Sequence, residues 1–188
     1  MERDTIEDII ANSYKDFHVK GFDYICLKRS PEHTRKVYFF NGDVRHMPEV
    51  VNPHDHRYDF TTKVLSGAVE NIDFQFAGDG DVYNKFNYLT PLNGGNGFEW
   101  VGETKLKKSG SYTYKRGAQY HLHSHNLHTI RIVRDGTVLM LDQYEDKVAV
   151  GQPTMTFCKG NEPPSLSGLY NKFTADQVVR YLKALGYE

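Results

Sequence analysis

The sequence of 188 residues predicts an all-β fold with one helix near each end of the chain. It contains 13 tyrosines and 11 phenylalanines, and aromatic residues are enriched in β-strands. Its apolar runs are short and are separated by glycine-containing turns, which is typical of β-sandwiches and small barrels. Helical spacing of apolar residues occurs near the two termini. Periodicity alone does not choose between a sandwich and a barrel.

The predicted helices cover residues 5–18 and 175–185. In the first, apolar residues recur at helical spacing, and Thr5 is placed to cap the N-terminus. In the second, Thr174 and Gln177 have the spacing of a capping box. We expect both helices to pack on the outside of the β-structure.

The strand-like runs all fall between about residues 22 and 160. They cover residues 24–28, 36–40, 69–76, 98–106, 111–115, 127–133 and 137–141. Residues 77–98 are rich in turn-forming residues and predict a long loop or an insertion. Asp135-Gly136 predicts a hairpin between the last two strands. We expect residues 1–188 to form a single domain.

Charge and cysteine content exclude some classes of partner. The chain has 23 basic and 24 acidic residues, so it offers no electrostatic case for binding nucleic acid or an anionic membrane. Cys26 and Cys158 are far apart and are expected to be buried free thiols. The charged N-terminus lacks the apolar core of a signal peptide, and no apolar run reaches membrane-spanning length. We therefore expect a cytoplasmic protein.

Two histidines introduce a run that reads as a strand. His54 and His56 share one face of that run, whereas Asp55 points away. Imidazole is the commonest protein ligand for many first-row transition metals, so a third histidine from another strand would complete a metal site. His121 is a candidate for that third ligand.

The stretch from His54 to Gly67 resembles the first cupin motif, which reads HxH, three or four residues, Glu, six residues, Gly. Phe60 occupies the glutamate position. The run from His54 to Phe60 is also similar to the first motif of small phage and bacterial cupins, roughly HDHPxDF, which lacks the glutamate too. Counted from Gly110, the histidine of the second cupin motif falls on His121. His123 and His125 share its face if the stretch is extended, so spacing alone could choose any of the three.

The resemblance implies a fold and a cofactor. Cupins fold as a double-stranded antiparallel β-helix, a jelly-roll-like barrel with the metal inside. From the resemblance, and from the exposed strand edges of an open barrel, we expect a homodimer. A three-histidine centre without the glutamate resembles that of the thiol dioxygenases. It implies a divalent transition metal, most often Fe(II), with Ni, Mn or Zn as alternatives, held here by His54, His56 and His121.

Further residues are expected to surround the metal or to line the pocket beside it. Tyr58 and Phe60 continue the face of the first two histidines, and His128 lies on the same face as Ile130 and so points into the barrel. The full set predicted around the metal is Tyr58, Phe60, Tyr112, Tyr114, His123 and His128.

The sequence supports three functional hypotheses. The first is an oxygenase-like enzyme that acts on a small organic substrate at the metal centre. The second is a non-catalytic cupin that binds a small ligand or a sugar. The third is a phage-type structural or accessory protein in which the metal only stabilises the barrel.

Overall fold

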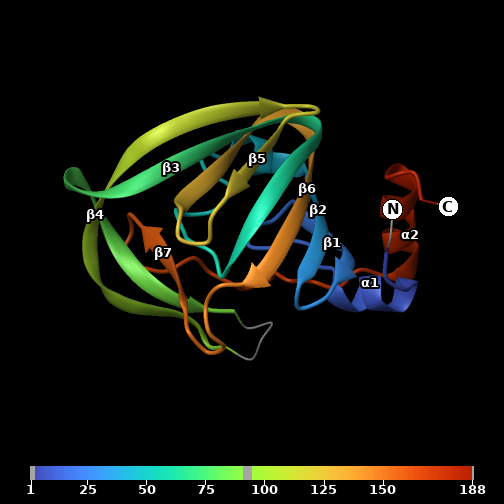
Figure 1. Cartoon of the computed structure of the whole chain (residues 1–188), viewed down its shortest axis with the longest axis horizontal. Coiled ribbons are helices and arrows are strands. Elements are labelled where there is room, and N and C mark those ends of the chain that lie inside the picture. Colours follow the sequence, from blue (N-terminus) through green and yellow to red (C-terminus); the bar gives the residue numbers. More distant parts are fainter. Residues whose placement is uncertain (1–2, 91–94, 188) are drawn as a thin grey trace.

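The computed structural model describes residues 3–90 and 95–187, except for the side chain of Arg45. Its strands form one antiparallel sheet that curls into a barrel, and a helix lies near each end of the described chain (Figure 1). The predicted all-β class with flanking helices is therefore confirmed. The elements are α1 (Ile6–Asn12), β1 (Phe22–Arg29), β2 (His33–Phe40), the short 3-10 helix η1 (Gly42–His46), β3 (Tyr58–Leu89), β4 (Gly97–Lys115), β5 (Gln119–Leu122), β6 (Leu127–Asp146), β7 (Thr154–Cys158) and α2 (Ala175–Ala184).

The sheet is organised around β3, which is 32 residues long. The strand order is β1-β2-β6-β3-β4, and both β5 and β7 also pair with β3. The first part of β3 lies between β6 on one edge and β5 and β4 on the other, whereas its last part lies between β4 and β7. β3 therefore pairs with β4, β5, β6 and β7.

Two sequence predictions about loops are wrong. Residues 77–98 are not a long insertion, because β3 continues to Leu89 and β4 begins at Gly97; residues 91–94 of that stretch lie outside the described residues. Asp135-Gly136 does not form a hairpin, because β6 runs through it. There Ala68 pairs with Arg134 and Ser66 with Val138, so that the extra residues of β6 form a bulge. Turn-forming residues in this chain mark bends of long strands as well as their ends.

The N-terminal helix is shorter than the predicted 5–18. It ends at Asn12, although Thr5 does cap it by accepting a hydrogen bond from the Asp8 amide. Ser13 ends the helix, because its hydroxyl donates to the carbonyl of Ile9 and accepts from the amide of Cys26 on β1. The C-terminal helix has the predicted capping box of Thr174 and Gln177.

Alternation along the edge strands separates two apolar clusters. On β1, Tyr24 and Cys26 face the barrel interior, whereas Ile25 and Leu27 face outward and pack in the cluster that includes residues of both helices. Both helices lie on one side of the molecule, beside β1 (Figure 1). Cys26 and Cys158 are buried free thiols, as expected. Within the described chain, neither helix is long and apolar enough to cross a membrane.

Candidate metal centre

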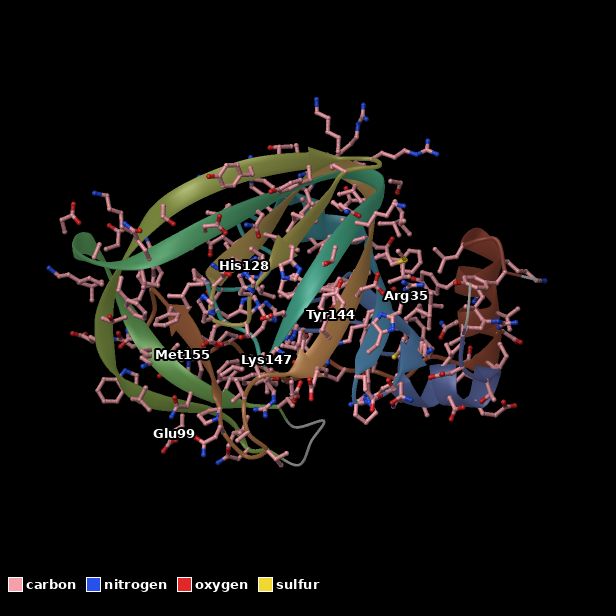
Figure 2. All side chains as sticks on the ribbon, in the orientation of Figure 1. Arg35, Glu99, His128, Tyr144, Lys147 and Met155 are labelled. Carbon is pink, nitrogen blue, oxygen red and sulfur yellow. The ribbon has the colours of Figure 1, made fainter. Side chains whose placement is uncertain are left out.

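Three histidines converge inside the barrel. One ring nitrogen from each of His54, His56 and His128 lies within 4.8 Å of the other two. The centroids of the three rings are 4.7, 5.1 and 5.2 Å apart. His128 lies between the walls of the barrel in Figure 2 and is 4 % exposed, whereas His54 and His56 are partly exposed. We call these residues the three-histidine group.

The backbone fixes two members of the group directly to each other. His54 and His128 form an antiparallel bridge in which the amide of each donates to the carbonyl of the other, at 3.0 Å in both cases. His54 also bridges Thr156 of β7. The segment before β3 is thereby clamped between β6 and β7, which places both His54 and His56 beside His128.

The outward-facing residues of the same segment anchor it. The Asp55 carboxylate accepts from the amide of Met155 at 2.6 Å, and the Asp59 carboxylate accepts from the amide of Ser124 at 2.7 Å. The Arg57 guanidinium donates to carbonyls in the loop after β6, at 2.7 Å for both Val148 and Ala149. The motif therefore alternates between inward imidazoles and outward anchors, and Asp59 belongs to the anchors.

Hydrogen bonds select the ring nitrogen that two of the three histidines present. His54 Nδ1 donates to the carbonyl oxygen of Asn52 at 2.8 Å, which leaves the lone pair on Nε2. His128 Nδ1 donates to Asn71 Oδ1 at 2.6 Å, and the amide of Asn71 donates in turn to Asp73 at 2.6 Å. Carbonyl and carboxylate partners of this kind commonly orient histidines that bind metals.

His56 completes the donor set. Its Nε2 lies 2.9 Å from His128 Nε2, so that His56 can donate to that nitrogen or both can share an ion. Burial lowers the pKa of His128 well below its ordinary value, and the neighbouring His54 lowers it further. Burial, followed by His54 and His128, does the same for the pKa of His56. Burial also lowers the pKa of His54. The three imidazoles are therefore neutral at pH 7, which is the form that binds metals.

The structure does not place His121 with His54 and His56. On β5, His121 pairs with Thr61, whereas the flanking residue Tyr120 pairs with Thr62. Because residues opposite each other share a face of the sheet, Tyr120 points inward with the buried Thr62 and His121 points outward. We therefore revise the third member of the group from His121 to His128, which the parity with Ile130 had placed inside the barrel.

The histidines of the second motif form a separate, exposed group. Ligand atoms of Asp59, His121 and His123 lie within 4.8 Å of one another on the outside of the barrel. His123 Nδ1 is 3.4 Å from the Asp59 carboxylate, and His121 Nδ1 is 3.1 Å from the hydroxyl of Thr61. His123 is therefore not part of the surroundings of the three-histidine group.

The four predicted aromatic residues differ in their positions. The ring centroid of Tyr58 is 5.5 Å from that of His56, and the buried Phe60 ring is 4.6 Å from it. Tyr114 packs on Tyr120 at 4.5 Å, against the barrel core. Tyr112 is 56 % exposed and lies on β4 opposite Asn71, and its place beside the site stays a prediction.

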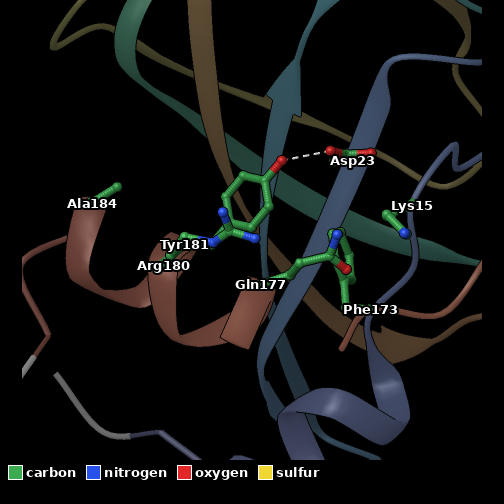
Figure 3. A pocket seen from close by; sticks show the side chains of 7 residues that line it. All are labelled: Lys15, Asp23, Phe173, Gln177, Arg180, Tyr181 and Ala184. Atoms are coloured by element: carbon green, nitrogen blue, oxygen red, sulfur yellow. Dashed lines mark hydrogen bonds between the residues drawn. The ribbon is translucent and has the colours of Figure 1, made fainter. Parts of the chain in front are cut away.

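A surface cavity of about 380 Å³ lies away from the histidines. It is bordered by α2 and β1, and its lining includes Lys15, Asp23 and Arg180 (Figure 3). Tyr181 donates to Asp23 there at 2.5 Å. None of its lining residues belongs to the three-histidine group.

No protein-family model matches this chain, and no curated protein matches it in sequence. Solved cupin structures are among those similar to it. One is an RmlC-like cupin from Shewanella frigidimarina, with 12% identity, 68% of this chain and 78% of that chain covered and a TM-score of 0.39. Another is the Cnp3 cupin domain of Schizosaccharomyces pombe, with 11% identity, 66% and 61% covered and a TM-score of 0.40.

A third similar structure is hydroxypropylphosphonic acid epoxidase from S. wedmorenis. It has 12% identity and a TM-score of 0.46, and 77% of this chain is covered. The match spans 59% of the length of that epoxidase.

Proposed function

We propose that this protein binds one divalent transition metal through His54, His56 and His128 and uses it in oxygenase-like chemistry on a small organic substrate. The observation that carries the proposal is the convergence of three neutral imidazoles, two of which have their ring nitrogens preset by Asn52 and Asn71. Fe(II) is our first choice of metal, with Ni, Mn and Zn as alternatives.

The donor set fits such a metal. Three imidazole nitrogens are suitable ligands for first-row transition metals, and none of the three ligands is a carboxylate. When bound, the metal keeps its full positive charge and has open coordination positions, which oxygenase or Lewis-acid chemistry requires. The chain itself contributes the orientation of the ligands through Asn71 and Asp73 and the apolar wall of Phe60.

Metal binding by matched variants tests the proposal. Protein purified without a nickel column and reconstituted with Fe(II), Mn(II), Ni(II) or Zn(II) should hold one tight equivalent by elemental analysis. We expect His128→Ala to lose it and His121→Ala to keep it, because only His128 lies with His54 and His56. Loss in His121→Ala with retention in His128→Ala would overturn the assignment.

The finer claim of oxygenase-like chemistry needs its own measurement. The Fe(II) form should bind nitric oxide, detected by electron paramagnetic resonance, and should consume O₂ with some member of a panel of small organic acids and thiols. A form that holds Fe(II) but does neither contradicts oxygenase-like chemistry. If the metal then raises the thermal stability of the protein and small ligands do not change that stability, the hypothesis that the metal only stabilises the barrel is favoured.

A further inference from the structure

A lysine lies inside the barrel. Along β2, Thr34, Lys36, Tyr38 and Phe40 alternate onto the interior face, and Tyr38 and Phe40 belong to the interior apolar cluster. Lys36 is only 9 % exposed. A buried ammonium is costly unless an anion or a set of hydrogen-bond acceptors compensates it.

The surroundings of Lys36 supply aromatic faces and no anion. Its Nζ lies 5.3 Å from the ring centroids of both Tyr24 and Tyr58. No carboxylate of the described chain forms an ion pair with it. Cation–π contacts stabilise an ammonium only partly, so its positive charge remains available to a ligand.

Lys36 is close to the three-histidine group. The Tyr58 ring that it contacts is 5.5 Å from the ring of His56. The charge of Lys36 is also one of the causes, after burial and the neighbouring histidines, of the lowered pKa of His56. The lysine and the candidate metal ligands therefore face the same interior.

A second polar element lies near His54. Its members are His18, whose Nδ1 is 2.8 Å from Tyr170 Oη, and Tyr88, whose Oη is 3.1 Å from the same oxygen. His18 and Tyr170 have φ of 69° and 59°, a conformation that non-glycine residues rarely adopt and that is often found at functional sites. Burial and then the nearby His54 lower the pKa of His18 to about 3. This element adds neutral polar groups and no negative charge.

We propose that Lys36 binds the negatively charged group of a small aromatic carboxylate, held beside the partly exposed Tyr58 and the three-histidine group. The inference rests on the proposed function, since it names the substrate class of that same site. A metal on three neutral imidazoles and an unpaired ammonium give the interior an excess of positive charge, which an anionic substrate neutralises. A carboxylate also accepts strong hydrogen bonds from an ammonium.

Calorimetric titration with benzoate tests the inference, and benzamide serves as the neutral probe of the same shape. The Co(II)-loaded wild type should bind benzoate, and Lys36→Met should weaken that binding about ten-fold or more, the effect of losing a charged hydrogen bond. Lys36→Arg should restore part of it. Lys63→Met removes an exposed lysine from β3 and should leave the affinity unchanged.

The outcomes separate the two proposals. Equal affinity of wild type and Lys36→Met for benzoate, with Co(II) still bound in both, overturns the role of Lys36 and leaves the metal centre intact. Equal losses for benzoate and benzamide also overturn it, because a general packing defect would affect both. Failure of the wild type to bind any metal contradicts the proposed function instead, and titration of that metal-free protein then tests Lys36 by the same comparison.

Discussion

Asn71 Oδ1 accepts a hydrogen bond from His128 Nδ1 at 2.6 Å, and this contact fixes which nitrogen of His128 faces the other two histidines. Both residues are buried, on neighbouring strands β3 and β6. The amide of Asn71 is held in turn by Asp73, so its oxygen cannot exchange places with its nitrogen without losing that bond.

We predict that Asn71→Leu lowers metal affinity about 10- to 100-fold, the usual effect of removing a group that orients a ligand. Asn71→Asp keeps an acceptor for His128 Nδ1 and should bind metal more tightly than Asn71→Leu. Competition with a chromophoric chelator measures both affinities. Wild-type affinity in Asn71→Leu would show that the contact does not orient the ligand.

Metal should stabilise the fold because the ligands come from distant parts of the chain. At a hundred-fold excess over the dissociation constant, binding to the folded state alone contributes about 2.7 kcal/mol. For a chain of this size we expect Tm to rise by about 5 °C or more. Thermal unfolding with and without Zn(II) measures the shift, and His54→Ala should abolish it. An equal shift in His54→Ala would place the stabilising ion elsewhere, for example at Asp59, His121 and His123.

Two glycines at the β3–β6 bulge form a matched pair. Both have positive φ, 72° at Gly67 and 65° at Gly136, but a Cβ on Gly67 would lie 2.6 Å from the Cα of Thr137, whereas a Cβ on Gly136 would meet nothing within 4 Å. Gly136→Ala should cost about 1 kcal/mol for the backbone conformation alone. Gly67→Ala should cost about 2–4 kcal/mol, because the backbone of β6 must also move. Urea unfolding compares them, and equal costs would contradict the close approach.

Asp142 should make stability dependent on pH at the acidic end. Burial alone would raise its pKa, but hydrogen bonds from Arg35 at 2.6 Å and His33 at 2.8 Å outweigh burial, and the pKa lies below its ordinary value. A lowered folded pKa means that the stabilisation is present above about pH 4, the unfolded value, and is lost as the pH falls through the folded pKa. We expect Asp142→Asn to cost about 1 kcal/mol at pH 7 and less at pH 2. Urea unfolding across that range measures the difference, and a cost independent of pH would contradict it.

Homodimerisation remains a prediction from the cupin resemblance. The outer edge of β1 offers no support for it, because the preceding segment covers that edge and Tyr14 and Tyr24 exchange backbone hydrogen bonds at 2.9 Å. Sedimentation equilibrium should give about twice the chain mass of 21.7 kDa. A single species at the chain mass would refute the dimer.

The local signals of the sequence predicted the fold class well. The capping residues Thr5 and Thr174 identify helix starts because capping is a contact within one turn. Strand continuity was harder, since Asp135-Gly136 can form a hairpin or a bulge, and the partner strand decides which. The end of α1 depends on a contact of Ser13 with β1 that no local pattern records.

The sequence pattern identified two of the three members of the three-histidine group as metal ligands. Alternation from His54 to Phe60 gave the inward histidines correctly, because it depends only on the pleat of one segment. The choice of His121 relied on counting from Gly110 across a loop. The face of the sheet on which His121 lies depends instead on its pairing with Thr61. The parity of His128 with Ile130 was the better signal. Lys36 was missed because a charged residue in an alternating strand normally indicates the exposed face.

The reciprocal backbone bond between His54 and His128 has a consequence for how the centre opens. The backbones of His54 and His128 cannot separate unless both amides lose their acceptors. Hydrogen exchange at these two amides should therefore be slow and correlated, at a rate set by opening of the sheet rather than by side-chain rotation. If a bound ion leaves by rotation of the His56 side chain alone, exchange at the two amides should be unchanged. If it leaves by opening of the barrel, exchange at both amides should accompany release.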